Sequence, residues 1–404
     1  MKRRTRDGGS RIDRKAAEAG NGVSQLTLME LPTAVLHEIF FKVPIKSIMK
    51  AKFVCTGLYK MLSDPEFAVN YTKKSPFTTL LLTRHRIIGN LDSPVFILME
   101  ISEDYQCFVT SLRPKIPDFV DSNSSLRLRG TCDGLLCLNL KKPRAEVAHI
   151  CNPFTGSLVL PVYEPKPGHI SSLVYGLGFC QSANKYKVLR VICTADPPQP
   201  ASCGYGEILT IGVDSRWRSL ENPAIPMLAF LRHLISLNGV LYWLLSCAGG
   251  HGSCIYNFDL GEERLGQTPS PPGVVLNGRV MRLVVLGNQL CVVDPSNRKT
   301  VVWKMKEHAS GQFWTKDIIL REHFPADVPF WGHCPLTISR NGDIILSNES
   351  VYWHNFVLSF NPEKRTSTKI TVLYPERIAY TPSLLSLKEL ITGQHWRNMN
   401  VLSN

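Results

Sequence analysis

Residues 28–67 read LMELPTAVLHEIFFKVPIKSIMKAKFVCTGLYKMLSDPEF, and this stretch decides how the first part of the chain folds. Apolar side chains recur at helical spacing from Val35 to Phe40 and again around Ile48. Pro32 and Pro44 precede these two runs, and proline is tolerated in the first turn of a helix. The spacing therefore predicts two short amphipathic helices joined by a tight break.

The helical pattern continues to the end of the stretch. In this interpretation Phe53-Val54 extend the second helix, and Leu58–Leu62 forms a third. Asp64-Pro65-Glu66 is typical of a helix start, with an aspartate N-cap followed by proline at the first helical position. Three helices in about forty residues bury too little surface to be stable alone, so we expect this bundle to need a partner.

The order of these residues resembles the F-box, a motif that docks onto the Skp-type adaptor of a Skp–Cullin–F-box ubiquitin ligase. Two positions differ from the family pattern, since Leu58 stands where tryptophan is usual and Thr56 where lysine is common. The resemblance implies twelve adaptor-binding residues: Leu31, Pro32, Val35, Leu36, Ile39, Phe40, Val43, Pro44, Ile48, Val54, Cys55 and Leu58. The alternative is a generic helical bundle that packs on the rest of the chain.

From Phe77 onward, short β-rich runs alternate with Gly, Pro, Asn and Asp turns. The first three strands are predicted at Phe77–Thr83, Pro94–Ile101 and Gln106–Leu112. A strand that follows a tight turn then recurs five times. Its equivalent positions, spaced 52, 53, 49 and 54 residues apart, are Leu136, Val188, Leu241, Leu290 and Ile344.

A period near fifty residues with about four strands fits the blade of a kelch-like β-propeller better than a β-sandwich. Phe77–Leu112 supplies a partial first unit, which gives about six blades, and Tyr380–Leu387 is the predicted strand that closes the ring. The predicted domains are a disordered basic tail at 1–25, the F-box at 26–71, the propeller at 77–390 and a C-terminal tail at 391–404. The fold class is thus a small all-α bundle followed by an all-β propeller.

The β region also resembles the F-box-associated domain that is common in plant F-box proteins. The matching segments are Gly130–Leu138, Cys151-Asn152-Pro153 with Leu160-Pro161, Gly176–Val191, Ser236–Leu244 and Phe258-Asp259-Leu260. This resemblance implies a substrate-binding module and leaves the substrate open.

The formal net charge of +13 is concentrated at the N-terminus, where residues 1–15 carry seven basic and two acidic side chains, or +5. This segment is a solvated arm, a nuclear-import signal or a polyanion contact. The remaining charge is dispersed, so nucleic-acid binding is not the favoured interpretation. Residues 1–22 lack an apolar run and no segment is apolar enough to span a bilayer, so we expect no membrane partner, reduced cysteines, and residence in the nucleus and/or cytoplasm.

Catalytic motifs fail their spacing tests. Gly249–Cys254 sets a His and a Ser among glycines but lacks the G-x-S-x-G order, and Cys132 and Cys137 are too far apart for a CxxC metal knuckle. We therefore expect a non-catalytic chain with no cofactor and no metal. Binding residues are expected on the loops Asp196–Gly206, Ala248–Ser253 and Glu322–His333, and most tryptophans are expected in the blade cores.

These patterns favour a substrate receptor of a Skp–Cullin–F-box ubiquitin ligase, with the Skp-type adaptor, the cullin core and an unidentified protein substrate as partners. Two other classes stay open. One is a propeller that binds a glycan or small ligand and carries an F-box, which a ring of exposed tryptophans would favour. The other is a hydrolase or oxidoreductase propeller, which a His/carboxylate/metal cluster would favour.

Overall fold

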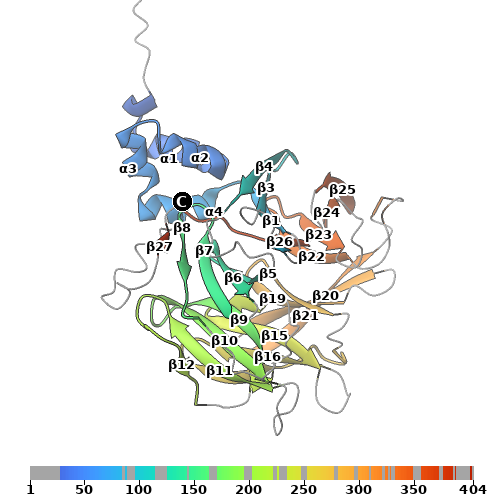
Figure 1. Cartoon of the computed structure of the whole chain (residues 1–404). Helices are drawn as coiled ribbons and strands as arrows, with labels where there is room; N and C mark the ends of the chain where they lie inside the picture. Colours follow the sequence, from blue (N-terminus) through green and yellow to red (C-terminus); the bar gives the residue numbers. More distant parts are fainter. Residues whose placement is uncertain are drawn as a thin grey trace, which may run out of the picture.

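The computed structural model describes residues 28–83, 87–88, 96–113, 125–142, 145–162, 171–194, 203–221, 225–226, 234–246, 253–276, 281–294, 299–308, 311–320, 324–325, 328, 333–348, 356–372, 376–384, 387 and 401–402. Helices come first in the chain and lie on one side of a larger body of strands (Figure 1). The predicted disordered tail at 1–25 lies outside the described residues.

The helical domain contains a 3-10 turn and four α-helices. Their bounds are η1 Leu28–Glu30, α1 Thr33–Phe41, α2 Ile45–Ala51, α3 Thr56–Leu62 and α4 Pro65–Lys74. The predicted N-cap is confirmed, because Asp64 Oδ1 accepts a bond of 2.8 Å from the backbone N–H of Glu66. The predicted extension of α2 through Phe53-Val54 is wrong. Backbone bonds from Phe53 to Lys50 and from Val54 to Ala51 tighten the chain into turns after α2 ends.

Six antiparallel sheets follow, each forming one blade of a propeller. Blade 1 has the order β26-β1-β3-β4 and blade 2 the order β2-β5-β6-β7-β8-β27, while blades 3 to 6 start at β9, β14, β18 and β22. The bounds in blades 1 and 2 are β1 Thr78–Thr83, β2 Ile87–Ile88, β3 Phe96–Ile101, β4 Cys107–Leu112, β5 Ser125–Cys132, β6 Leu135–Lys141, β7 Glu146–Asn152, β8 Gly156–Val159, β26 Glu376–Ala379 and β27 Val401–Leu402.

Blades 3 and 4 contain β9 Ser171–Cys180, β10 Lys185–Thr194, β11 Cys203–Thr210, β12 Arg218–Ser219, β13 Ile225–Pro226, β14 Ile235–Leu237, β15 Val240–Ser246, β16 Ser253–Asp259 and β17 Arg264–Thr268. Blades 5 and 6 contain β18 Arg282–Leu286, β19 Gln289–Asp294, β20 Lys299–His308, β21 Gly311–Leu320, β22 His333–Ile338, β23 Ile344–Asn348, β24 Phe356–Asn361 and β25 Thr366–Thr371. The predicted six-blade architecture is confirmed.

The predicted repeat corresponds to the second strand of each blade. All five equivalent positions lie on such strands, namely β6, β10, β15, β19 and β23. In blade 4 the preceding turn is the pair Asn238-Gly239, with φ of 49° and 81°. Both residues need the left-handed region that a two-residue hairpin requires, and Asn and Gly adopt it most readily.

The ring is closed by β26, which pairs antiparallel with β1 in the register Leu80↔Ala379. The closing strand therefore precedes the predicted segment Tyr380–Leu387, and that prediction is wrong in its position. After Ala379 the chain bends toward blade 2, where the Tyr380 hydroxyl donates to the carbonyl of Gly134 at 2.7 Å. The backbone N–H of Tyr380 still donates to the carbonyl of Thr79 in β1 at 3.1 Å, so Tyr380 is held by both its backbone and its side chain. At the chain end, β27 pairs with β8, so two residues of the predicted C-terminal tail join blade 2.

The two ends of the blades differ in the length of their connections. Connections between strands 1 and 2 or 3 and 4 run from two residues, 133–134, to seven residues, 211–217. Those between strands 2 and 3, or from one blade to the next, run from four residues, 142–145, to fifteen residues, 220–234. We call these ends the turn face and the loop face. Because β1 is the second strand of its blade, it begins at the turn face. The chain therefore passes from α4 into the propeller at that face.

One cysteine contradicts the expectation of a fully reduced chain. Cys254, in β16, is disulfide-bonded. Nine other described cysteines form no disulfide bond, and Cys55 and Cys107 among them are exposed. The sequence spacing of the cysteines gave no sign of this bond.

Candidate functional site

Large apolar side chains on the helical domain face solvent. Phe53 and Val54, between α2 and α3, are 85% and 72% exposed. With them we group the five large apolar residues of η1, α1 and α3 that are each more than 40% exposed, and we call this set the apolar helix surface: Leu28, Met29, Val35, Ile39, Phe53, Val54 and Tyr59. Exposed apolar side chains gathered on so small a unit are typical of a protein-binding site.

Helix α1 shows how the apolar helix surface arises. Leu36 and Phe40 lie four residues apart on the face that packs into the bundle, and both are buried. Val35 and Ile39 have the same spacing one residue earlier, which places them on the adjacent face, and both are exposed. The helix therefore has two apolar faces, of which the bundle covers one.

The structure divides the twelve predicted adaptor-binding residues by exposure. Five are exposed: Pro32, Val35, Ile39, Val54 and Cys55. Three are half-buried: Leu31, Val43 and Pro44. Four lie in the core of the bundle: Leu36, Phe40, Ile48 and Leu58. In the free chain the last four stabilise the bundle. Contact between the twelve residues and an adaptor stays a prediction.

Four residues of the apolar helix surface were missed by the sequence reasoning: Leu28, Met29, Phe53 and Tyr59. Phe53 was assigned to a helix that ends two residues before it. Leu58 and Leu62 lie four residues apart on the buried face of α3, and Tyr59 comes one residue after Leu58, so it lies off that face. The helical spacing in the sequence contains this signal.

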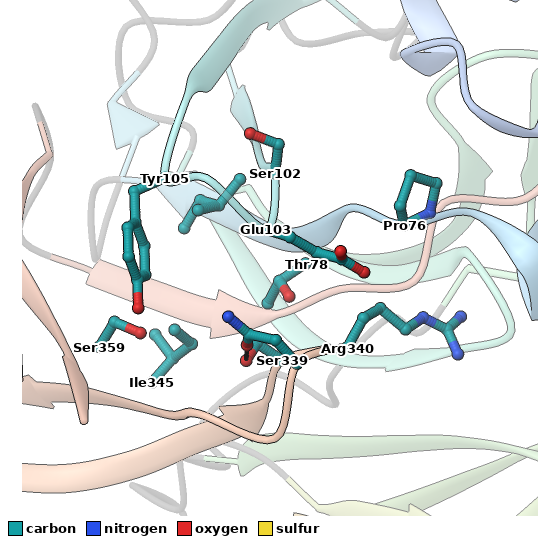
Figure 2. A pocket seen from close by; sticks show the side chains of 11 residues that line it. Pro76, Thr78, Ser102, Glu103, Tyr105, Ser339, Arg340, Ile345 and Ser359 are labelled. Carbon is teal, nitrogen blue, oxygen red and sulfur yellow. Dashed lines mark hydrogen bonds between the residues drawn. The ribbon is translucent and has the colours of Figure 1, made fainter. Parts of the chain in front are cut away.

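A polar cluster joins blade 1 to blade 6 at the turn face. The buried carboxylate of Asp343 accepts bonds from the Tyr105 hydroxyl at 2.6 Å and from the Ser359 hydroxyl at 2.8 Å. Asn361 Nδ2 donates to its other oxygen at 2.8 Å. Figure 2 shows Tyr105 directed toward Ser359 beside a pocket, whose empty space of about 220 Å³ includes open solvent. These contacts tie the β3–β4 turn of blade 1 to blade 6.

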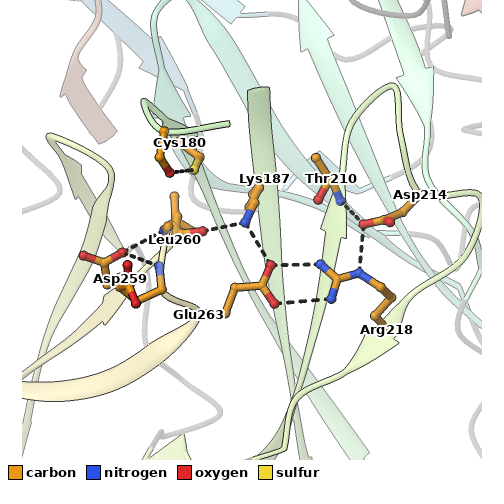
Figure 3. Close-up of polar contacts among 11 residues, drawn as sticks. Cys180, Lys187, Thr210, Asp214, Arg218, Asp259, Leu260 and Glu263 are labelled. Atoms are coloured by element: carbon orange, nitrogen blue, oxygen red, sulfur yellow. Dashed lines mark hydrogen bonds and ion pairs between the residues drawn. The ribbon is translucent and has the colours of Figure 1, made fainter. Parts of the chain in front are cut away.

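A second network joins blade 3 to blade 4 (Figure 3). Lys187 Nζ donates to the carbonyl of Leu260 at 2.6 Å and to Glu263 at 2.8 Å, and Arg218 donates to the same Glu263 at 2.8 Å. Arg218 also bonds Asp214 at 3.3 Å. Burial acts to raise the pKa of Glu263, but the bonds from Arg218 and Lys187 lower it overall. The charges are matched in pairs, so the network stabilises the blade contact.

Most residues of the three predicted binding loops lie outside the described residues. The strand ends that flank those loops belong to the loop face. The described tryptophans Trp217, Trp243, Trp303 and Trp314 are all buried or half-buried. Trp217, for example, stacks under Arg190 at 4.1 Å and donates to the carbonyl of Pro161. Trp331 and Trp353 lie outside the described residues.

Among the described residues, no three His, Cys, Asp or Glu side chains come together as they would around a metal ion. No helix there has the length and apolar content needed to cross a bilayer.

Two family models match the chain. Residues 28–70 match the F-box domain, and residues 93–382 match the F-box associated beta propeller domain. The chain belongs to the F-box proteins that carry this propeller domain. Such proteins are in general non-catalytic adaptors. An F-box implies binding to a Skp-type adaptor, and its combination with a propeller fits a substrate receptor of a ubiquitin ligase.

Relatives from Arabidopsis thaliana extend over nearly the whole chain. F-box protein At3g07870 is 27% identical over 390 residues, which cover 90% of this chain and 88% of the relative. Putative F-box protein At1g53370 is 27% identical and covers 85% and 87%, and F-box protein CPR1 is 23% identical and covers 80% and 81%. A solved structure described as part of a structural and mechanistic analysis of two prolyl endopeptidases aligns with 85% of this chain and 54% of its own chain. Its TM-score is 0.39 and its identity 10%, too distant a likeness to inform function.

Proposed function

We propose that this F-box protein is the substrate-recognition subunit of a Skp–Cullin–F-box E3 ubiquitin ligase. The apolar helix surface binds the Skp-type adaptor and through it the cullin core, and the propeller binds a protein substrate. The observation that carries the proposal is the exposure of Phe53 and Val54, together with that of Val35 and Ile39 on α1 and Tyr59 on α3. Side chains of this kind gain free energy when a partner removes them from water.

The chain acts in this proposal by proximity. It holds the substrate near the ubiquitin carrier and raises the local concentration of acceptor lysines, and the bond chemistry takes place elsewhere in the ligase. The blades are of the kelch-like kind, and the protein resides in the nucleus and/or the cytoplasm. We propose no membrane partner and no nucleic-acid partner, because the charge outside residues 1–15 is dispersed.

The rival glycan- or ligand-binding function would be supported by a ring of exposed tryptophans. The four described tryptophans are instead engaged in packing, and no described residue favours that rival. We therefore advance the ligase function alone.

A co-purification experiment with a purified Skp-type adaptor tests the proposal on the full chain. Phe53→Asp places a charge in the apolar helix surface, so we expect adaptor binding to be lost while the thermal unfolding of the protein is unchanged. Phe313→Asp is the matched control, because Phe313 is an exposed phenylalanine on β21 of the propeller. Undiminished adaptor binding by Phe53→Asp would refute the assigned surface. Failure of the unsubstituted chain to bind would refute the ligase function.

A further inference from the structure

Glu100 is a glutamate in an otherwise apolar strand, and it is fully buried. Side chains alternate along β3, so Phe96, Leu98 and Glu100 share one face, whose cross-strand neighbours at Glu100 are Thr79 and Phe108. Phe96 and Leu98 belong to a hydrophobic cluster that contains helical residues, whereas the alternate residues of β3 pack toward blade 6. Glu100 therefore faces the helical domain.

The backbone N–H of Ile45 donates to Glu100 Oε1 at 2.9 Å. Ile45 is the first residue of α2, and the N-cap position before it is Pro44, which offers no side-chain acceptor. The first N–H groups of a helix have no partner within the helix and favour a nearby negative charge. The propeller thus supplies, from a residue 55 positions away, the cap that the sequence of α2 lacks.

The surroundings of Glu100 are shared between the two domains. Tyr71 on α4 is buried and donates its hydroxyl to the carbonyl of Val43 at 3.1 Å, next to the start of α2. A second polar contact lies nearby at the turn face, where Arg340 of blade 6 donates to the carbonyl of Thr72 at 3.0 Å. The hydrophobic cluster that includes Phe96 continues into α1, α2, α3 and α4.

The second oxygen of Glu100, Oε2, is buried without a hydrogen-bond partner among the described residues. Burial raises the pKa of this carboxyl to about 7, with the Ile45 bond acting in the opposite direction. A buried carboxyl with a single bond is unfavourable for stability when compared with an apolar side chain of similar size. What Glu100 supplies and an apolar residue does not is the acceptor for α2.

We propose that Glu100 is a latch that fixes the start of α2, and with it the helical domain, in one orientation on the propeller. The latch makes the apolar helix surface and the loop face parts of a single rigid unit. It acts as a positioning residue, and it holds whether or not the ligase function is correct, because it depends on contacts within this chain.

Hydrogen exchange of the Ile45 amide reports on the latch directly, because that N–H is the donor. In Glu100→Gln the side-chain carbonyl still accepts, so we expect exchange within twofold of the unsubstituted protein. Glu100→Met has a similar volume and offers only a weak acceptor, so we expect exchange at α2 to rise at least tenfold while the strands keep their protection. Glu103→Gln is the control, since Glu103 is an exposed glutamate three residues along the same blade.

Equal exchange in Glu100→Met and in the unsubstituted chain would overturn the proposal. So would equally fast exchange in the Gln and Met variants, which would indicate that the charge or the packing matters and the acceptor does not. If Glu100→Met fails to fold while Glu100→Gln folds, Glu100 is required by the whole chain, and a latch confined to the domain contact is refuted. Adaptor co-purification of the unsubstituted protein is a separate readout, so failure of the ligase function is distinguishable.

Discussion

Truncation of the Val54 side chain is expected to lower the affinity for the adaptor and to leave the stability of the fold unchanged. The side chain is 72% exposed in the free chain, and Val54→Ala removes two methyl groups. Burial of each methylene-sized group contributes about 0.8 kcal/mol, so the exposed fraction of the two groups contributes roughly 1 kcal/mol when a partner covers them. We therefore expect adaptor affinity to fall roughly fivefold to tenfold. Val54→Asp buries a charge in the same contact and is expected to weaken binding by more than about a hundredfold.

Titration calorimetry with a purified adaptor and the full chain measures these affinities. Val275→Ala and Val275→Asp are matched controls, because Val275 is a valine of almost the same exposure, 74%, in the connection between β17 and β18. The controls and the Val54 variants are expected to unfold at the temperature of the unsubstituted protein, since none of the altered side chains is buried. Equal affinities for the Val54 and Val275 variants would refute the reasoning, because the apolar helix surface would then not be the contact.

Three further predictions concern stability. Leu58 is buried in the bundle, so Leu58→Ala is expected to destabilise the helical domain by about 2–5 kcal/mol, seen as a lower unfolding temperature; an unchanged temperature would contradict its core role. Burial raises the pKa of Glu100 from 4.5 to about 7, so the folded chain holds a proton that the unfolded chain has lost. The stabilising effect of that proton is complete below pH 4.5 and is lost as pH rises through 7, so the free energy of unfolding in urea should fall by up to about 3 kcal/mol. Tyr71 is a titratable side chain that interacts electrostatically with Glu100. Glu100→Gln should remove this dependence of stability on pH. Tyr105→Phe loses the bond to Asp343 between blades 1 and 6 and is expected to lower the free energy of unfolding in urea by about 1 kcal/mol, whereas a larger loss would indicate that the two blades separate.

The strand order was predictable because its signals are local. Turn pairs such as Asn238-Gly239 are followed by alternating apolar residues, and each such turn leads into the second strand of a blade. The closing strand was misplaced because Glu376–Ala379 pairs with β1, almost 300 residues earlier in the chain, and no local signal marks that pairing. Tyr380 bonds β1 through its backbone and Gly134 of blade 2 through its side chain, so it marks the point where the chain leaves blade 1.

The segment that holds the candidate site could be predicted, but which of its apolar side chains are exposed could not. Val35 and Leu36 are adjacent and both apolar, and only the packed bundle shows that the first is exposed and the second buried. Phe53 lies beyond the end of α2, which depends on backbone turns at Lys50 and Ala51 that the helical spacing does not reveal. Glu100 was not predicted to be a site: a charge within an apolar strand is a signal that the sequence contains, but its bonding partner, Ile45, lies in the other domain.

The position of the helices follows from which strand closes the ring. Strand 1 of a blade runs from the loop face to the turn face, and strand 2 returns, because neighbouring strands are antiparallel. Since β26 supplies strand 1 of blade 1, the first propeller strand in the sequence, β1, is strand 2 and starts at the turn face. Had β1 been strand 1, the chain would have entered at the loop face and the helices would have packed against the longer connections. A single C-terminal strand therefore directs the helical domain to the short turns, where Glu100 and Arg340 can reach it, and leaves the helices at the end of the propeller opposite the loop face.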